Sequence, residues 1–297
     1  MALHQRLTNH NTSITINQIM DIKFFIPRWG NRHLSWADFA SKAKNAGYAG
    51  VEANLPMQKE EQTEMFDQLN QNGLIWIGQH FETSASNFKD YYPEFETRLN
   101  ALAAAKPLLI NTQTGKDYFT FEENCKLIEL ATKISAANGI TILQETHRGK
   151  FSFCAATTAQ FLRKYPDLRI TADFSHWCCV SESYLQDQKE SLDLAVSRTD
   201  HIHSRIGHPG GPQVNNPAAP EWKEAIDFHC EWWDTIVNRH LALKTPILTI
   251  TCEFGPFPYM PQLPFSQKDV SDLWEANLFM KNLLESRYKS LLNRSLS

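Results

Sequence analysis

Four side chains that can bind a metal ion stand at the ends of four successive strand-like stretches in the second half of the chain. The stretches read TILQETHRG, LRITADFSHW, DHIHSRIG and PILTITCEFGPFPY, and they carry Glu145, Asp173, His203 and Glu253. Each stretch is rich in β-branched residues and ends in polar residues, a pattern typical of a β-strand and the turn that follows it. Three carboxylates and one imidazole suit Mn²⁺, Mg²⁺, Co²⁺ or Zn²⁺ better than a thiol-preferring metal. The pattern predicts one divalent metal ion in a catalytic site.

Alternation along the strands indicates which side chains face inward. Glu145 and His147 share one side of their strand, and His201, His203 and Arg205 share one side of theirs. Helices cover the outer face of a barrel strand, where an unpaired carboxylate would cost free energy. We therefore expect these residues to line the interior and the pocket above it.

Asp173 and His176 are three residues apart in the segment ADFSHW. They converge only if the strand ends at Asp173 and a helical turn begins there. In that case Asp173 can bind the metal ion while His176 lies near the substrate.

Strand and helix candidates alternate from the segment DIKFFIP to the end of the chain. We expect strands near residues 22–28, 49–54, 74–80, 107–112, 140–145, 169–173, 200–206 and 247–253. Amphipathic segments such as WADFASKAKNAG and FEENCKLIELATKISAANG separate them, and several end in glycine, at Gly47, Gly73 and Gly139. Repeated strand–helix units predict an α/β fold, a single-domain (β/α)8 TIM barrel over residues 22–297 after a polar N-terminal extension at residues 1–21.

The rival architecture is an open, doubly wound sheet. That fold would favour a glycine-rich phosphate loop after the first strand. The chain has Arg28-Trp29-Gly30-Asn31 there and no GxGxxG motif. The barrel is therefore favoured, and the carboxyl ends of its strands are where chemistry is assembled.

Composition and charge exclude several classes of function. The 297 residues carry a net charge of −4, which gives no basic footprint for nucleic acid. No apolar stretch approaches the roughly 20 residues of a membrane span, and the first residues lack the apolar core of a signal peptide. The six cysteines have no CxxC spacing, which favours reduced, mostly buried thiols. We expect a cytoplasmic protein with no nucleic-acid or membrane partner.

Two long segments follow the seventh and eighth predicted strands. GHPGGPQVNNPAAP contains His208 and Gln213, which are candidate substrate contacts. For the proline-rich segment at residues 254–266, a specificity loop, a rigid surface turn and an oligomer contact are all open. A second group of candidate pocket residues comprises Glu52, His80, Trp29 and Trp177. The signal is less specific here, because residues of these types often only fill a core or satisfy a buried polar group.

The chain resembles the xylose isomerase-like barrels, which include sugar isomerases and epimerases, inosose dehydratase-type lyases and endonuclease IV. GYAGVEANL is similar to the GxxGVE segment of that family. The other motifs that carry the resemblance are QETHRG with Glu145, DFSH with Asp173 and His176, HIHSR with His203 and Arg205, and CEFG with Glu253. They span the predicted barrel in the family's order.

The resemblance to the ketose 3-epimerase branch implies roles for these residues. The matching Glu145, Asp173, His203 and Glu253 would bind one metal ion, and His176 and Arg205 would contact the substrate. Endonuclease IV needs three metal ions and additional histidines, but here the fourth strand ends in INTQTG and the seventh loop has no Asp-x-His. This departure argues against DNA repair.

The predicted function is a metal-dependent isomerase or epimerase acting on a ketose or related sugar or polyol. Glu145 and Glu253 are the candidate catalytic residues for proton transfer through a metal-stabilised enediolate, with His147 as a candidate proton shuttle. One alternative is a metal-dependent lyase that dehydrates an inosose- or dehydroshikimate-like substrate. Another is a non-catalytic polyol-binding barrel, whose mark would be a lost ligand. The expected partner is a small sugar or polyol, and a homo-oligomer is compatible with the long loops.

Overall fold

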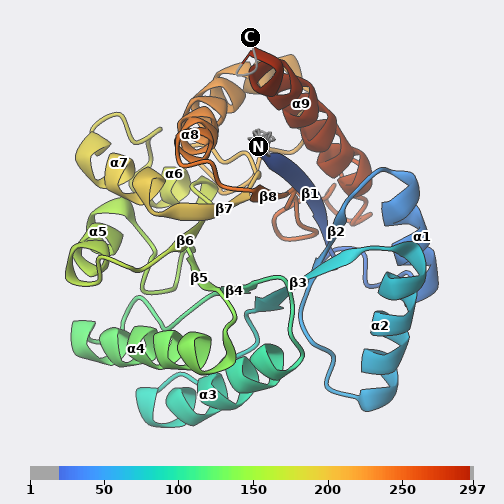
Figure 1. Cartoon of the computed structure of the whole chain (residues 1–297). Helices are drawn as coiled ribbons and strands as arrows, with labels where there is room; N and C mark the ends of the chain where they lie inside the picture. The colour runs from blue at the N-terminus through green and yellow to red at the C-terminus, as the bar shows by residue number, and fades with distance from the viewer. Residues whose placement is uncertain (1–19, 295–297) are drawn as a thin grey trace, which may run out of the picture.

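Eight parallel strands close into a barrel in sequence order (Figure 1). The computed structural model describes residues 20–294, so most of the predicted polar extension lies outside the described residues. The strands are β1 (Asp21–Pro27), β2 (Gly50–Ala53), β3 (Ile75–His80), β4 (Ile110–Thr112), β5 (Ile142–Glu145), β6 (Ile170–Ala172), β7 (Thr199–His203) and β8 (Ile247–Thr251). Each overlaps its predicted range, and the predicted TIM barrel is confirmed.

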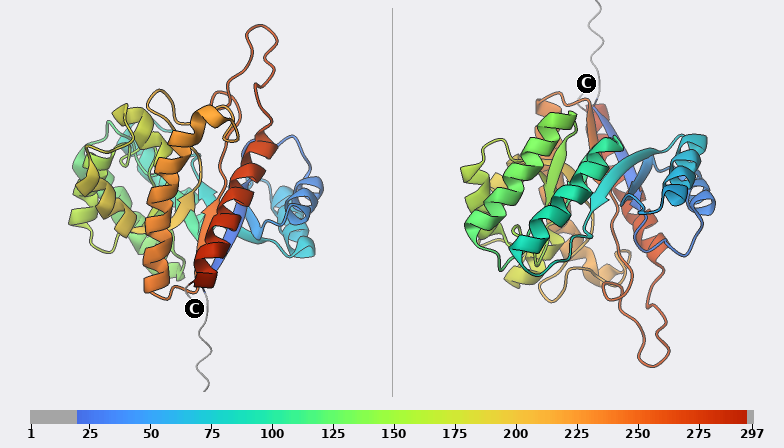
Figure 2. Two further views of the ribbon diagram at one scale, coloured as in Figure 1. Left: turned by 90° about the horizontal axis from the view of Figure 1, so that it is seen from above. Right: turned by 90° about the horizontal axis from the view of Figure 1, so that it is seen from below.

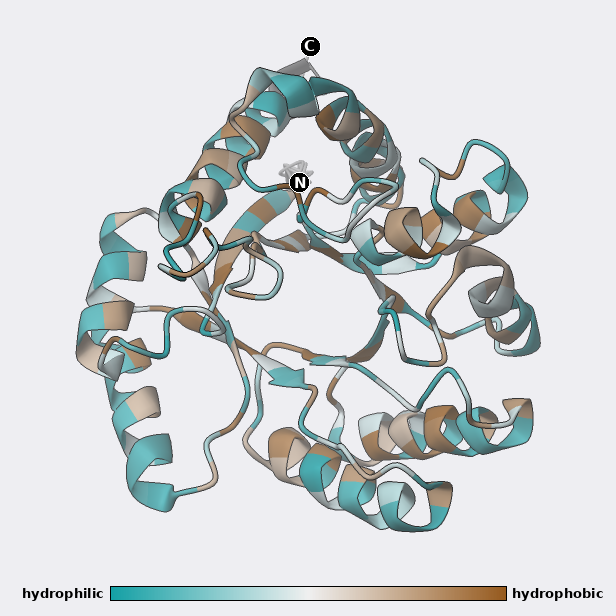
Figure 3. Ribbon diagram, turned by 180° about the vertical axis from the view of Figure 1, so that it is seen from behind, coloured by the Kyte–Doolittle hydropathy of each residue, from teal (hydrophilic) through white to brown (hydrophobic). Residues whose placement is uncertain are grey.

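Helices surround the barrel and turn their apolar faces toward it (Figure 3). They are α1 (Trp36–Asn45), α2 (Lys59–Asn72), α3 (Phe88–Ala104), α4 (Phe121–Asn138), α5 (Ala155–Lys164), α6 (Ser175–Ser181), α7 (Lys189–Ser197), a short 3-10 turn (Pro220–Trp222), α8 (Lys223–Ala242) and α9 (Leu273–Arg294). Aliphatic and aromatic side chains between helices and strands form the main hydrophobic core.

Local signals set the ends of several helices. Gly73 and Gly139 cap α2 and α4 in the left-handed conformation, at φ of 63° and 62°, which glycine adopts without steric cost. Helix α3 begins at Phe88. The Asn87 side chain caps it by accepting from a backbone N–H of the first turn. Pro93 is the sixth residue of α3 and has no N–H to donate to the carbonyl of Lys89, so the helix lacks one hydrogen bond there.

A small apolar layer fills the barrel beneath the polar site. Phe25, Ile77, Leu109 and Leu143 form a separate buried cluster. Gln79, Asn111 and Glu145 follow Ile77, Leu109 and Leu143 by two residues each and also point inward. Because successive inward residues are two apart, the apolar layer directly supports the polar one.

Two expectations from composition concern thiols and membrane spans. All six cysteines carry free thiols, and Cys125, Cys178, Cys230 and Cys252 are buried, in agreement with the prediction. Across residues 20–294, none of the helices combines the length and apolar character that crossing a membrane requires.

Candidate active site

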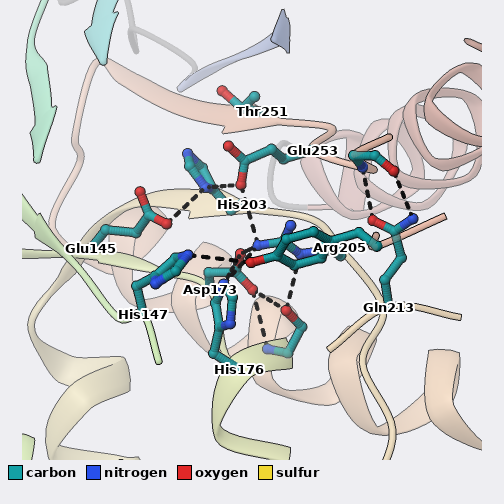
Figure 4. Close-up of polar contacts among 12 residues, drawn as sticks. Glu145, His147, Asp173, His176, His203, Arg205, Gln213, Thr251 and Glu253 are labelled. Atoms are coloured by element: carbon teal, nitrogen blue, oxygen red, sulfur yellow. Dashed lines mark hydrogen bonds and ion pairs between the residues drawn. The ribbon is translucent and has the colours of Figure 1, made fainter. Parts of the chain in front are cut away.

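The structure brings the four predicted metal ligands together at the carboxyl ends of β5 to β8 (Figure 4). Glu145, Asp173, His203 and Glu253 each offer an oxygen or nitrogen atom, and these atoms all lie within 4.8 Å of one another. Nδ1 of His203 lies 2.7 Å from Oε2 of Glu253 and 4.0 Å from Oε1 of Glu145. All four side chains are buried. These four residues are called the quartet below.

Arg205 lies beside the quartet, as alternation along β7 predicted. Its Nη2 forms an ion pair with Oδ2 of Asp173 and lies 3.5 Å from Oε2 of Glu253. The same nitrogen is 2.9 Å from Nε2 of His176. A guanidinium can only donate, so Nε2 of the neutral His176 accepts. Burial raises the pKa of Asp173 although Arg205 opposes that shift.

Side-chain amides hold the two glutamates of the quartet. Nε2 of Gln79 donates to Glu253 at 2.8 Å. Nδ2 of Asn111 and Nε2 of Gln113 donate to the two oxygens of Glu145 at 2.8 and 3.1 Å. These hydrogen bonds fix the orientation of both carboxylates. Asn111 and the neighbouring amides were not among the predicted site residues.

The donor set fits a divalent metal ion. His203 Nδ1 is buried and has no hydrogen-bond partner, because its close contact with Glu253 lacks the direction of a hydrogen bond. A buried ring nitrogen without a partner, aimed at three carboxylates, is what an imidazole ligand presents to a metal ion. Carboxylate oxygens and imidazole nitrogen are donors for which Mg²⁺, Mn²⁺ and Zn²⁺ are suited.

The charge balance also favours a cation. Glu52, Glu145, Asp173 and Glu253 are all at most 2% exposed, and Arg205 at 1% is the guanidinium buried with them. Buried carboxylates without compensating charge are costly. Burial, with the neighbouring carboxylates, raises the pKa of Glu145 to about 8 although the His203 imidazole opposes this shift. A divalent cation would lower that cost.

A cavity of about 150 Å³ opens directly above the quartet. Its lining includes four residues predicted from the sequence and four that were not. These are Trp29, His147, Arg205 and Glu253, and then Gln79, Phe81, Gln113 and Tyr259. The cavity therefore combines an aromatic wall with polar groups that converge on its floor.

Tyr259 comes from the loop after β8 and reaches back into the cavity. Its hydroxyl lies 3.4 Å from Nε2 of His147, and its ring meets Trp29 edge-on at 5.2 Å. Nδ1 of His147 lies 2.6 Å from the carbonyl oxygen of Arg148, so Nδ1 carries the proton and Nε2 accepts from the phenol. Burial, together with the charge of Arg205, lowers the pKa of His147 well below its usual value, which keeps the imidazole neutral.

His80 does not reach the cavity although it ends β3. It points outward, where its ring packs against Phe95 of α3 and its nitrogens contact the hydroxyls of Thr112 and Thr83 at 2.9 Å. Alternation along β3 turns Gln79 inward instead. Both residues are polar, so alternation in the sequence alone does not decide which of them faces inward.

Three other residues that were predicted to bind substrate make their contacts outside the cavity. Trp177 is fully buried and donates to a backbone carbonyl. His208 packs against Trp222, away from the cavity lining. Gln213 uses both ends of its amide on the backbone of Gly255. Gln213 therefore holds a loop that contributes to the cavity rather than facing the cavity itself.

Fold and site together define a single-domain TIM barrel with a carboxylate–imidazole centre at the carboxyl ends of its strands. A 3-keto-D-glucoside 4-epimerase from E. coli matches it with a TM-score of 0.57 and 14% identity, over 90% of this chain and 99% of that chain. A probable 3-DHS dehydratase from Bacillus anthracis gives a TM-score of 0.54 and 19% identity, over 88% and 98%. Endonuclease IV from Thermus thermophilus gives a TM-score of 0.52 and 13% identity, over 91% and 99%.

These likenesses establish the fold. The resemblance to xylose isomerase-like barrels is confirmed at that level, because a xylose isomerase domain protein from Salmonella typhimurium matches with a TM-score of 0.56 and 13% identity, over 80% of this chain and 90% of that chain. No family model and no curated protein sequence matches the chain. An epimerase, a dehydratase and an endonuclease share the architecture, so function has to be argued from the site.

Proposed function

We propose that the protein is a divalent-metal-dependent isomerase or epimerase that acts on a ketose or a related sugar or polyol. One observation carries this proposal: the donor atoms of Glu145, Asp173, His203 and Glu253 gather within 4.8 Å of one another. A small cavity opens above them. The quartet would hold one Mn²⁺, Mg²⁺, Co²⁺ or Zn²⁺ ion. When bound, such an ion supplies Lewis-acid polarisation of a carbonyl and its neighbouring hydroxyl.

Two glutamates of the quartet would move the proton. Glu145 removes it from the carbon beside the polarised carbonyl, and Glu253 returns one, on the same or the opposite face. Asn111 and Gln113 fix both oxygens of Glu145, and Gln79 fixes Glu253. Without a metal ion, burial raises the pKa of Glu145. A bound divalent cation would favour the ionised carboxylate, which can then accept the proton.

The cavity favours a small polar substrate. Trp29 and Tyr259 present aromatic surface, which packs on the C–H faces of a sugar. Arg205, His147 and Gln113 supply polar groups to the same lining. A cavity of about 150 Å³ is small for a ligand pocket, since these commonly span about 300–1,000 Å³. A single monosaccharide or cyclitol is the expected partner, and nucleic acid is not.

A dehydratase is the second candidate, favoured by the pairing of Tyr259 and His147. Dehydration begins with the same proton abstraction but then needs a donor for the departing hydroxyl group. The Tyr259 hydroxyl lines the cavity and could protonate that group. The likeness to the probable 3-DHS dehydratase is compatible with this reaction.

The deciding experiment is incubation of the Mn²⁺- or Co²⁺-loaded protein with sugar and cyclitol panels in D₂O. Deuterium uptake at one carbon without loss of water supports isomerisation or epimerisation, and loss of water from the substrate supports dehydration. Glu145→Gln with unchanged metal content should abolish exchange. Retained exchange in that variant would remove Glu145 from the proposed role.

A further inference from the structure

We propose that Glu52 is a positioning residue that sets the orientation and tautomer of His203 so that Nδ1 faces the quartet. This inference rests on the proposed metal site and extends it to a residue beneath that site. Glu52 lies on β2, points inward and is fully buried. It is not part of the quartet and does not line the cavity.

The contacts of Glu52 converge from three other strands. Nε2 of His203 lies 3.1 Å from each of its carboxylate oxygens. The Thr251 hydroxyl donates to Oε2 at 2.5 Å, and Nδ2 of Asn111 donates to Oε1 at 2.9 Å. Nε2 of His201 lies 3.2 Å from Oε2. Side chains from β4, β7 and β8 therefore fix the position of the carboxylate.

An ionised carboxylate can only accept hydrogen bonds. Facing both oxygens of Glu52, Nε2 of His203 must carry a proton. In a neutral imidazole the other nitrogen is then a lone-pair acceptor, and here that atom is Nδ1, beside Glu253 and Glu145. A carboxylate behind a histidine ligand also increases the basicity of the ligating nitrogen. Glu52 thus prepares His203 for a cation on the other side of the ring.

A second metal site is the competing explanation, since Glu52, His201 and His203 offer three donor atoms within 4.8 Å of one another. These atoms already have partners. Besides its contacts to Glu52, His201 Nδ1 lies 2.7 Å from the Thr249 hydroxyl, and Nε2 lies 3.2 Å from that of Thr251. This cluster offers one carboxylate where the quartet offers three. We therefore assign it to positioning and expect one metal ion per chain.

The test compares Co²⁺ binding to the metal-free full chain in the wild type, Glu52→Gln and Glu64→Gln. Glu64 is an exposed residue of α2, so its variant is a control for the same change of charge. Loss of such a supporting carboxylate weakens metal affinity by about 10- to 100-fold. We expect that loss in Glu52→Gln, one ion per chain in all three proteins, and wild-type affinity in Glu64→Gln.

Equal affinity in the wild type and Glu52→Gln would overturn the assignment. Two ions in the wild type and one in Glu52→Gln would overturn it in favour of a second metal site. If Glu52→Gln does not fold, Glu52→Asp, which keeps the charge but withdraws it from His203, should show the same direction of change.

A measurement without metal separates this inference from the proposed function. Long-range ¹⁵N–¹H spectra of histidine-labelled, metal-free protein report which ring nitrogen of His203 is protonated. The surrounding carboxylates raise the pKa of His203 although burial opposes this shift, so the spectra are recorded over a rising pH series. In the neutral ring we expect the proton on Nε2 in the wild type and its partial loss in Glu52→Gln. If the wild type binds no metal, the proposed metal site fails, yet this spectrum still decides whether Glu52 sets the tautomer. An unchanged tautomer in Glu52→Gln would refute the role.

Discussion

The side-chain amide of Gln213 forms two reciprocal hydrogen bonds with the backbone of Gly255. Nε2 donates to the Gly255 carbonyl at 3.1 Å, and the Gly255 N–H donates to Oε1 at 2.8 Å. A side chain at Gly255 would collide with the ring of Trp29, since a Cβ atom there would lie 1.9 Å from it. The loop after β7 thus fixes the start of the loop after β8, which extends well beyond the barrel (Figure 2). Through this contact it also holds Tyr259 and Trp29 in place.

Gln213→Ala should therefore destabilise the protein and loosen the cavity wall. It leaves two buried backbone groups of Gly255 without partners, at about 1–3 kcal/mol for such a group. Urea unfolding should show a loss on that scale and Trp29 fluorescence should change. Gln262→Ala, in the exposed part of the loop after β8, is the control and should stay within about 0.5 kcal/mol of wild type. Equal stability of the two variants would contradict the role of Gln213.

Arg205→Met should destabilise the metal-free protein strongly. The guanidinium is 1% exposed and pairs with Asp173, so its removal leaves a buried carboxylate without its partner, at about 3–5 kcal/mol. The double variant Arg205→Met/Asp173→Asn removes both charges and should recover part of the loss. Thermal unfolding of the two variants checks this, and a double variant less stable than the single one would argue against the pairing.

Metal ions should stabilise the fold by mass action. At a free concentration of about 100 times Kd, a bound ion adds about 2.7 kcal/mol, which for a chain of this size raises Tm by roughly 4 °C. EDTA should reverse the shift. Asp173→Asn should reduce it, while Asp269→Asn in the exposed loop should not. If metal ions raise the Tm of Asp173→Asn as much as that of the wild type, Asp173 is not a ligand.

Tyr259→Phe should raise KM for the substrate found in the D₂O panel. The phenol donates to His147, so its oxygen can accept a hydrogen bond from a substrate hydroxyl. Loss of one such bond, about 0.5–1.5 kcal/mol, corresponds to a 2- to 13-fold change. A rise in KM with unchanged kcat indicates binding, whereas a large fall in kcat, with water as a product, indicates that the phenol is the acid of a dehydration. Phe257→Leu, at an exposed site, should leave both constants unchanged.

Acid should weaken the fold partly through His229 of α8. Its Nδ1 lies 2.8 Å from the Ala225 carbonyl, and its Nε2 accepts from the Gly207 N–H at 3.3 Å, so the buried ring is neutral. Burial lowers its pKa from 6.5 to about 4. Because the unfolded chain takes up the proton first, this stabilisation is complete above pH 6.5 and is lost as the pH falls toward 4. The loss is on the order of 3 kcal/mol.

Urea unfolding between pH 7.5 and pH 4.5 measures this loss. His229→Gln should show a shallower decline in stability with falling pH than the wild type. Parallel declines would show that His229 does not contribute.

The sequence by itself determined the barrel and the quartet, because both follow from local periodicity. Alternation of inward and outward residues places Glu145 and His203 inside, and repeated strand–helix units bring successive strand ends to one face. The same alternation does not choose between Gln79 and His80, which are neighbouring polar residues on opposite faces of β3.

The tertiary structure alone decided the contacts made by loops and by strands on opposite sides of the barrel. Tyr259 and Gln213 lie in irregular segments, which have no period from which a direction can be read. The pairing of Arg205 with Asp173, and of Glu52 with His203, depends on which side chains closure of the barrel brings within hydrogen-bonding distance. Those distances arise from the packing of the whole chain, so the quartet could be predicted from the sequence and the residues that orient its side chains could not.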